Sequence, residues 1–146
     1  MRKVTKEYIK EVFDECNRLY FDNQLKNCKF TTFRTQSRSK GFVNMKNVKG
    51  KIHGRMGIAT NVLWTEDSFK EIVIHEMIHL YNEQIEHKHC AIIGHSWHFR
   101  RKLKQLNKKH GMKMTITHHN VYIVNEKIPS TFFGKLMRRI KIELAL

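Results

Sequence analysis

The chain has 146 residues, with 28 Lys and Arg against 13 Asp and Glu, and its formal net charge is +15. This length suits one compact domain, so we expect residues 1–146 to form a single domain. No apolar run is long enough to cross a bilayer and the N-terminus lacks a signal-peptide core, which argues against a membrane partner and favours a cytoplasmic protein. We also expect a monomer. The excess of positive charge favours a polyanionic partner, nucleic acid first of all.

The first predicted element is a helix that begins after Thr5. A threonine at that position can cap a helix by accepting a hydrogen bond from a backbone N–H of the first turn. The apolar residues that follow recur at helical spacing, as expected of a helix with one buried face. They are Ile9, Val12, Phe13, Cys16, Leu19 and Tyr20.

Residues 28–62 change character and predict short strands joined by turns. Apolar residues, many of them Phe, Val and Ile, are interrupted there by Gly41, Gly50, Gly54 and Gly57. A strand at the edge of a sheet can pair with an extended peptide, whereas an interior strand cannot. The segment from Met56 to Thr60 is compatible with either position.

The segment from Thr65 to Glu86 predicts a longer, mostly buried helix that contains a metal-binding motif. His75 and His79 are four residues apart, so they project from one helical face and can bind one metal ion. Glu76 lies beside them, where its carboxylate can take a proton from water and pass it to a leaving amine. Such a pattern arises by chance in roughly one of twenty comparable chains. Burying all three polar groups is nevertheless costly without a partner, and one bound Zn²⁺ ion supplies it.

A catalytic zinc ion takes three protein ligands, so one ligand must come from outside this pair. Glu83 shares the helical face of His79, but one straight helix is poorly placed to supply a third ligand. His87, His89 and Cys90 follow in a predicted loop.

His95 is the favoured third ligand. It opens a segment in which Phe99, Leu103 and Leu106 recur at helical spacing, and the sequence Lys108-Lys109-His110-Gly111 is typical of a helix end. His98, three residues further on, is the reserve ligand. His98, Tyr81 and Arg100 are also candidates for contacts with the ligands, the oxyanion or the substrate.

Basic residues gather in three clusters that acidic residues do not balance. The first spans residues 46–51 and the third lies in the tail, at Lys135, Arg138, Arg139 and Lys141. The middle cluster falls on the solvent side of the helix that follows His95, so it predicts a DNA-contacting surface near the metal site. Its members are Arg100, Arg101, Lys102, Lys104, Lys108 and Lys109. The sequence has no recognised module that reads DNA bases. Binding should therefore use contacts to the DNA backbone, tolerate any DNA sequence and depend strongly on salt.

Beyond Gly111, residues 112–146 predict a strand or hairpin over Met114 to Val124, followed by a basic amphipathic tail. A tail helix packed on the domain is favoured over a membrane-surface helix, because a small fold needs that apolar area for its own core. The three cysteines form no close pair, and their odd number leaves at least one thiol free, as suits a reducing compartment.

Three stretches resemble the SprT-like zinc metalloproteases, which include the Spartan DNA-protein crosslink proteases. The first is FDECNRLYFDNQL at residues 13–25, and the second is HEMIHLY at residues 75–81. The third is the family's His-Gly-x-x-Phe motif, matched by His95, Trp97, His98 and Phe99 with Ser96 in place of Gly. The resemblance covers about residues 8–110, and no paired cysteines for the zinc ribbon of many members follow Cys90.

The resemblance implies a small α+β, zincin-like protease domain. It would comprise an N-terminal helix, a small twisted sheet, the active-site helix and a following helix that carries the third ligand. His75, His79 and His95 would bind zinc and Glu76 would be the general base. The implied activity is zinc-dependent endopeptidase action on DNA-bound or DNA-crosslinked proteins. Two alternatives stay open: a basic nucleic-acid-binding protein with structural or vestigial zinc, and a peptidase dedicated to one regulatory protein.

Overall fold

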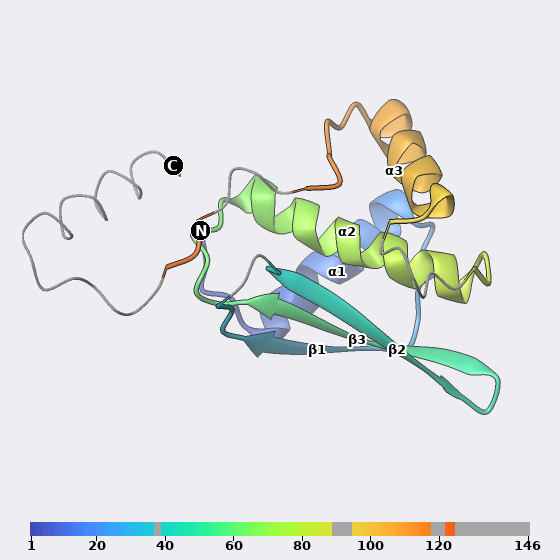
Figure 1. The fold of residues 1–146 in the computed structure, drawn as a ribbon, viewed down its shortest axis with the longest axis horizontal. Coiled ribbons are helices and arrows are strands. Elements are labelled where there is room, and N and C mark those ends of the chain that lie inside the picture. Colours follow the sequence, from blue (N-terminus) through green and yellow to red (C-terminus); the bar gives the residue numbers. More distant parts are fainter. Residues whose placement is uncertain (37–38, 89–94, 118–121, 125–146) are drawn as a thin grey trace, which may run out of the picture.

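The computed structural model describes residues 1–36, 39–88, 95–117 and 122–124. In chain order these residues form α1 (Lys6–Tyr20), β1 (Cys28–Phe33), β2 (Gly41–Val48), β3 (Lys51–Ala59), α2 (Glu66–Gln84) and α3 (Trp97–His110). In Figure 1, α2 lies between the sheet and α3. The described residues therefore form the predicted α+β fold, in which the three strands come, in chain order, between the first helix and the helix that bears the His75 motif.

The three strands pair in the order β1-β3-β2, with β1 parallel and β2 antiparallel to β3. Met56 on β3 is bracketed by Phe30 on β1 and Val43 on β2. The backbone N–H of Thr60 bonds to Phe33. The edge-strand alternative for Met56 to Thr60 is therefore wrong, because β1 and β2 already use both hydrogen-bonding sides of β3. The edges of the described sheet are β1 and β2.

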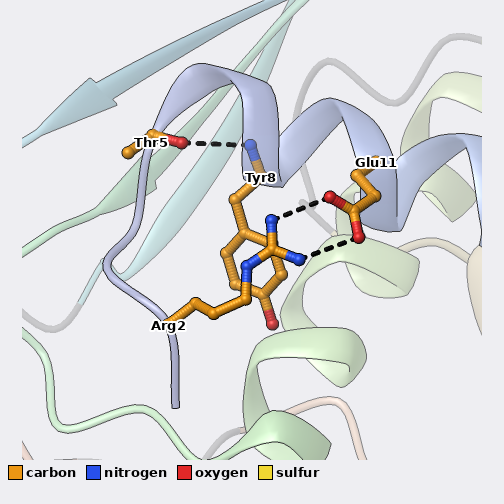
Figure 2. A network of polar contacts seen from close by, with 4 residues as sticks. All are labelled: Arg2, Thr5, Tyr8 and Glu11. Carbon is orange, nitrogen blue, oxygen red and sulfur yellow. Dashed lines mark hydrogen bonds and ion pairs between the residues drawn. The ribbon is translucent and has the colours of Figure 1, made fainter.

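Helix α1 begins at the predicted cap. The hydroxyl of Thr5 accepts a hydrogen bond from the backbone N–H of Tyr8 at 3.1 Å. Arg2 donates two hydrogen bonds to Glu11, at 2.9 and 2.8 Å, and its guanidinium lies 4.3 Å from the centre of the Tyr8 ring (Figure 2). On α2, the Phe69 ring stacks on Tyr8 at 4.8 Å. The start of α1 is thereby fixed against the N-terminal turn of α2.

Helix α2 is buried on several sides, because the sheet, α1 and α3 all pack against it. Its apolar residues include Ile74, Met77, Ile78 and Leu80, each no more than 1% exposed. On β3, a Cβ at Gly54 would lie only 3.0 Å from Leu80, so this glycine leaves room for the helix. A helix with contacts on several sides places some of its polar residues in the interior, and this is where the histidine motif lies.

The segment after α3 differs from the predicted strand. Residues 112–117 contain no strand, and Ile123 forms one isolated antiparallel bridge with Val62. Residues 118–121 and the amphipathic tail at 125–146, with its basic cluster, lie outside the described residues. None of the described helices is long and apolar enough to span a membrane.

Candidate metal centre

Helix α2 fixes two of the predicted ligands. It starts with a capping box in which Thr65 and Ser68 exchange side-chain to backbone hydrogen bonds, and Glu66 and Asp67 complement the helix dipole. Ten residues further on, His75 is 7% exposed. The rings of His75 and His79 lie 5.2 Å apart, on one face of the helix.

The third histidine precedes α3 rather than lying on it. His95 is followed by Ser96, the N-cap, and the helix begins at Trp97. The Ser96 hydroxyl accepts from the backbone N–H of Phe99 at 3.4 Å, and Gly111 ends the helix in the left-handed conformation at φ 65°. Ser96 itself has φ −64° and ψ 172°, so its backbone does not require glycine. The replacement of Gly by Ser in the motif is thus accommodated, with the serine side chain capping the helix.

The structure brings the three histidines together. Nε2 of His75 lies 2.9 Å from Nε2 of His95, and one nitrogen from each of His75, His79 and His95 lies within 4.8 Å of the others. Zinc–nitrogen bonds of about 2.0–2.1 Å in a tetrahedral site place two ligand nitrogens about 3.3 Å apart. The 2.9 Å between the His75 and His95 nitrogens is close to this value, so the two nitrogens fit a shared cation. Among the described residues, this cluster is the one that could hold a metal ion.

Phe99 packs beneath all three rings. Its centroid lies 4.8 Å from that of His75, 4.5 Å from His79 and 4.7 Å from His95. The side chain is 1% exposed and belongs to the core. Because Phe99 lies on the first turn of α3, it couples the position of that helix to the ligands on α2.

Glu76 is buried beside the histidines, with 5% of its surface exposed. Gly41, the first residue of β2, faces it: a Cβ at Gly41 would lie 3.3 Å from Oε1 of Glu76 and 3.0 Å from Ile72. Burial raises the pKa of the Glu76 carboxyl to about 8. A nearby cation would favour the ionised form and lower that pKa again. The sequence indicates a turn at Gly41 and gives no sign of its contact with Glu76, which comes from a distant part of the chain.

The imidazoles are held in the form that binds metal. Burial, and then the neighbouring His95, lower the pKa of His79 to about 4. Burial and the charge of Arg100 likewise lower the pKa of His95. Neutral imidazole is the ligand form, so these shifts favour metal binding at neutral pH.

The remaining candidates lie around the centre rather than in it. Arg100 donates through Nε to the carbonyl oxygen of His95 at 3.3 Å. His98 points to Glu86, with Nδ1 3.5 Å from Oε2. Tyr81 contacts Lys102, whose Nζ lies 3.9 Å from the ring centre. Tyr81 follows His79 by two residues, about 200° around the helix, so it faces away from the ligands.

Glu86 anchors the start of α3. It lies just after α2 and accepts a hydrogen bond from Arg101 at 2.7 Å while it faces His98. The sequence did not predict this role of Glu86, because no local pattern shows that its side chain contacts residues of α3. The Glu83 and His87 side chains are not members of the metal cluster, and His89 and Cys90 lie outside the described residues.

The basic residues of α3 mostly face solvent. Four are exposed without an acidic partner among the described residues: Arg100, Lys104, Lys108 and Lys109. Arg101 is also exposed but pairs with Glu86, and Lys102 is half-buried against Tyr81. Trp97, at the first position of the helix, is 65% exposed, and Arg101 stacks 4.8 Å from its ring centre.

An α+β domain with two histidines one turn apart on a buried helix, a third histidine from the next segment and a buried carboxylate has the organisation of zincin-like metalloproteases. The chain belongs to the SprT-like family, which matches residues 9–118, slightly beyond the stretch predicted from the sequence. Its function is accordingly of the metalloprotease type. No curated protein matches the sequence.

Proposed function

We propose that this protein is a zinc-dependent endopeptidase that acts on proteins bound or crosslinked to DNA. The observation that carries the peptidase part is the convergence of His75, His79 and His95 beside the buried carboxylate of Glu76. A purely structural zinc site normally has four protein ligands, whereas a site with three leaves a position for water or substrate.

In this proposal His75, His79 and His95 hold Zn²⁺, and Glu76 is the general base. The metal, when bound, polarises the scissile carbonyl and lowers the pKa of water. Glu76 accepts the proton of the attacking water and transfers it to the leaving amine. Its burial suits this role, because a carboxylate in a low-dielectric site binds a proton more readily than one in solvent.

The substrate would lie along β2. This strand is an edge of the described sheet, and its first residue, Gly41, adjoins the carboxylate of Glu76. An extended peptide added to that edge would form main-chain hydrogen bonds that do not depend on its sequence. Such pairing would bring the scissile bond past the Glu76 carboxylate.

The DNA-linked part rests on charge. The formal net charge is +15, and the exposed cations of α3 begin at Arg100, which contacts His95. DNA held along α3 would carry an attached protein close to the metal centre. Because the contacts are to phosphates, they should be insensitive to sequence and weaken as salt rises.

The test compares zinc-loaded wild type with Glu76→Gln, using a histone as substrate, with and without single-stranded DNA at low salt. We expect cleavage by the wild type, stimulation by DNA, and loss of cleavage in Glu76→Gln with zinc content and DNA affinity unchanged. Cleavage indifferent to DNA would exclude the DNA-linked substrate and favour a peptidase dedicated to one protein. No cleavage by folded, zinc-loaded wild type would favour a nucleic-acid-binding protein with structural zinc.

A further inference from the structure

The sheet is built from a segment that contains no acidic residue. Between Asp22 and Glu66 the sequence has no Asp or Glu, so every carboxylate of the described domain lies on a helix or in a helix-flanking segment. The same segment has nine Lys and Arg residues. They are Lys26, Lys29, Arg34, Arg38, Lys40, Lys46, Lys49, Lys51 and Arg55. The positive charge of the domain is therefore unbalanced on the sheet, as it is on α3, whereas acidic residues offset it on α1 and α2.

One face of the sheet packs against the helices. Phe30 of β1 contacts Phe13 of α1, with ring centres 5.1 Å apart, and Gly54 of β3 adjoins Leu80 of α2. Phe30 is in register with Met56, two residues from Gly54, so these positions share a face. Both α1 and α2 therefore cover the same face. Residues in the alternate register point to the opposite face, which no described helix covers.

Cations lie side by side on this helix-free face. Lys29 on β1 is the lateral neighbour of Arg55 on β3, and Lys46 on β2 is the neighbour of His53. Together with Asn44 they line a groove of about 620 Å³. Like charges on adjacent strands destabilise a sheet. Among the described residues, none of Lys29, Lys46 and Arg55 forms an ion pair that would relieve this repulsion. A polyanion in the groove would relieve it.

An aromatic pair adjoins the cations on the same face. Phe42 lies in register with Gly57, and a Cβ at Gly57 would come within 2.3 Å of the Phe42 ring, so the ring occupies the space above this glycine of β3. The Phe33 ring lies 5.3 Å from that of Phe42. Both side chains are partly exposed. Cations with partly exposed aromatic rings on one surface are the arrangement that binds single-stranded nucleic acid, because bases stack on the rings while phosphates meet the cations.

We propose that the helix-free face of the sheet is a binding surface for single-stranded nucleic acid, with Lys29, Lys46 and Arg55 contacting phosphates and Phe33 and Phe42 contacting bases. This inference deepens the proposed function, since it assigns nucleic acid to a second surface besides α3. It also places the strand on the side of the sheet away from the metal centre.

The experiment measures binding of a labelled thymidine oligonucleotide to the full, zinc-loaded chain. All variants carry Glu76→Gln, so that the result does not depend on whether the protein cleaves anything. The test variant is Lys29→Ala/Lys46→Ala/Arg55→Ala. Loss of three phosphate contacts should lower the salt dependence, the slope of log K against log salt, by about 2 and weaken binding about ten-fold or more at moderate salt. Circular dichroism and zinc content report whether the variant is folded.

The matched control is Lys3→Ala/Lys6→Ala/Lys10→Ala, which removes the same charge from exposed positions at and before α1. Its slope should stay near that of the parent. If the sheet variant and this control bind alike, the inference is overturned, because only net charge then matters. Phe42→Leu keeps an apolar side chain on Gly57 but cannot stack on a base. It should weaken single-strand binding several-fold and leave duplex binding unchanged. Unchanged single-strand binding by Phe42→Leu would overturn the stacking role and the preference for single strands.

Discussion

Gly41 lies against Glu76, and the absence of a side chain on Gly41 is what allows the carboxylate to sit beside β2. The backbone of β2 approaches α2 at the one residue of the strand that has no Cβ. This contact links the edge strand, where a substrate would pair, to the proposed general base. A change at Gly41 should therefore act on the chemistry more than on metal binding.

The substitution Gly41→Ala should reduce turnover and leave zinc content unchanged. Its Cβ would meet Ile72 at 3.0 Å, Ile58 at 3.2 Å and the Glu76 carboxylate at 3.3 Å, so these neighbours must move by a few tenths of an ångström. Overpacking of this kind costs about 1–3 kcal/mol of stability. Peptide cleavage and zinc content measured on the same samples separate the two effects.

Gly54→Ala is the control for crowding. A Cβ there would meet Leu80 at 3.0 Å, a similar clash, but no atom of Glu76. Both variants should lose similar stability, and only Gly41→Ala should lose turnover per bound zinc. Equal turnover losses would mean that Gly41 acts through stability alone.

The third ligand can be tested against its neighbour in sequence. His95→Ala removes one of the three clustered nitrogens, whereas His98→Ala removes a ring that faces Glu86. Loss of a group that only orients a ligand costs 10–100-fold in metal affinity, so loss of a ligand should cost about 100-fold or more. Competition with a coloured chelator measures this. His98→Ala should stay near wild type, because Arg101 still holds Glu86. The opposite order would exchange the roles of the two histidines.

The parts of the fold that local chemistry specifies were predictable from the sequence. Thr5 and Thr65 cap the helices that they were expected to cap, and Gly111 ends α3. Side-chain hydrogen bonds at helix ends depend on residues only a few positions apart, so a sequence reveals them. The approach of His95 to His75 was predicted from the spacing of the motifs and the family resemblance.

Strand order was not predictable in this way. Gly54 indicated a turn, yet it lies within β3, as Gly57 does, and Leu80 and the Phe42 ring occupy the space that side chains at these two positions would need. These partners are 26 and 15 residues away in the sequence, so no local pattern shows them. The central position of β3, which excludes Met56 from the sheet edge, follows from the same long-range pairing.

The cap of α3 should influence metal binding through the position of His95. Ser96→Ala removes the hydroxyl that accepts from Phe99, which costs about 0.5–1 kcal/mol for a long hydrogen bond of this kind. Ser96→Gly costs only a few tenths of a kcal/mol, because glycine lets water reach the free N–H groups. Zinc affinity and the thermal unfolding temperature should therefore be highest for wild type, lower for Ser96→Gly and lowest for Ser96→Ala. If Ser96→Gly bound zinc more weakly than Ser96→Ala, backbone freedom next to His95 would outweigh the cap.

The metal-free protein should lose stability as pH rises from about 6.5 to 8. Glu76 has a pKa of about 8 in the folded chain against 4.5 when unperturbed, so between these values the folded state holds a proton that the unfolded state has released. The free energy of unfolding then falls with rising pH, by at most about 1.4 kcal/mol per unit. His79 acts in the opposite direction, because its pKa is about 4 in the folded chain against 6.5. The histidine effect ends near pH 6.5, so above it the largest expected contribution among the described residues is that of Glu76.

Urea unfolding in the presence of a chelator, at several pH values across that window, measures the slope. In Glu76→Gln the slope should vanish, since the amide does not titrate. With zinc bound, stability should instead rise with pH. The cation favours ionised Glu76, and it binds neutral imidazoles, for which protons compete at lower pH. A metal-free Glu76→Gln protein that kept the slope of the wild type would show that some group other than Glu76 carries the buried proton.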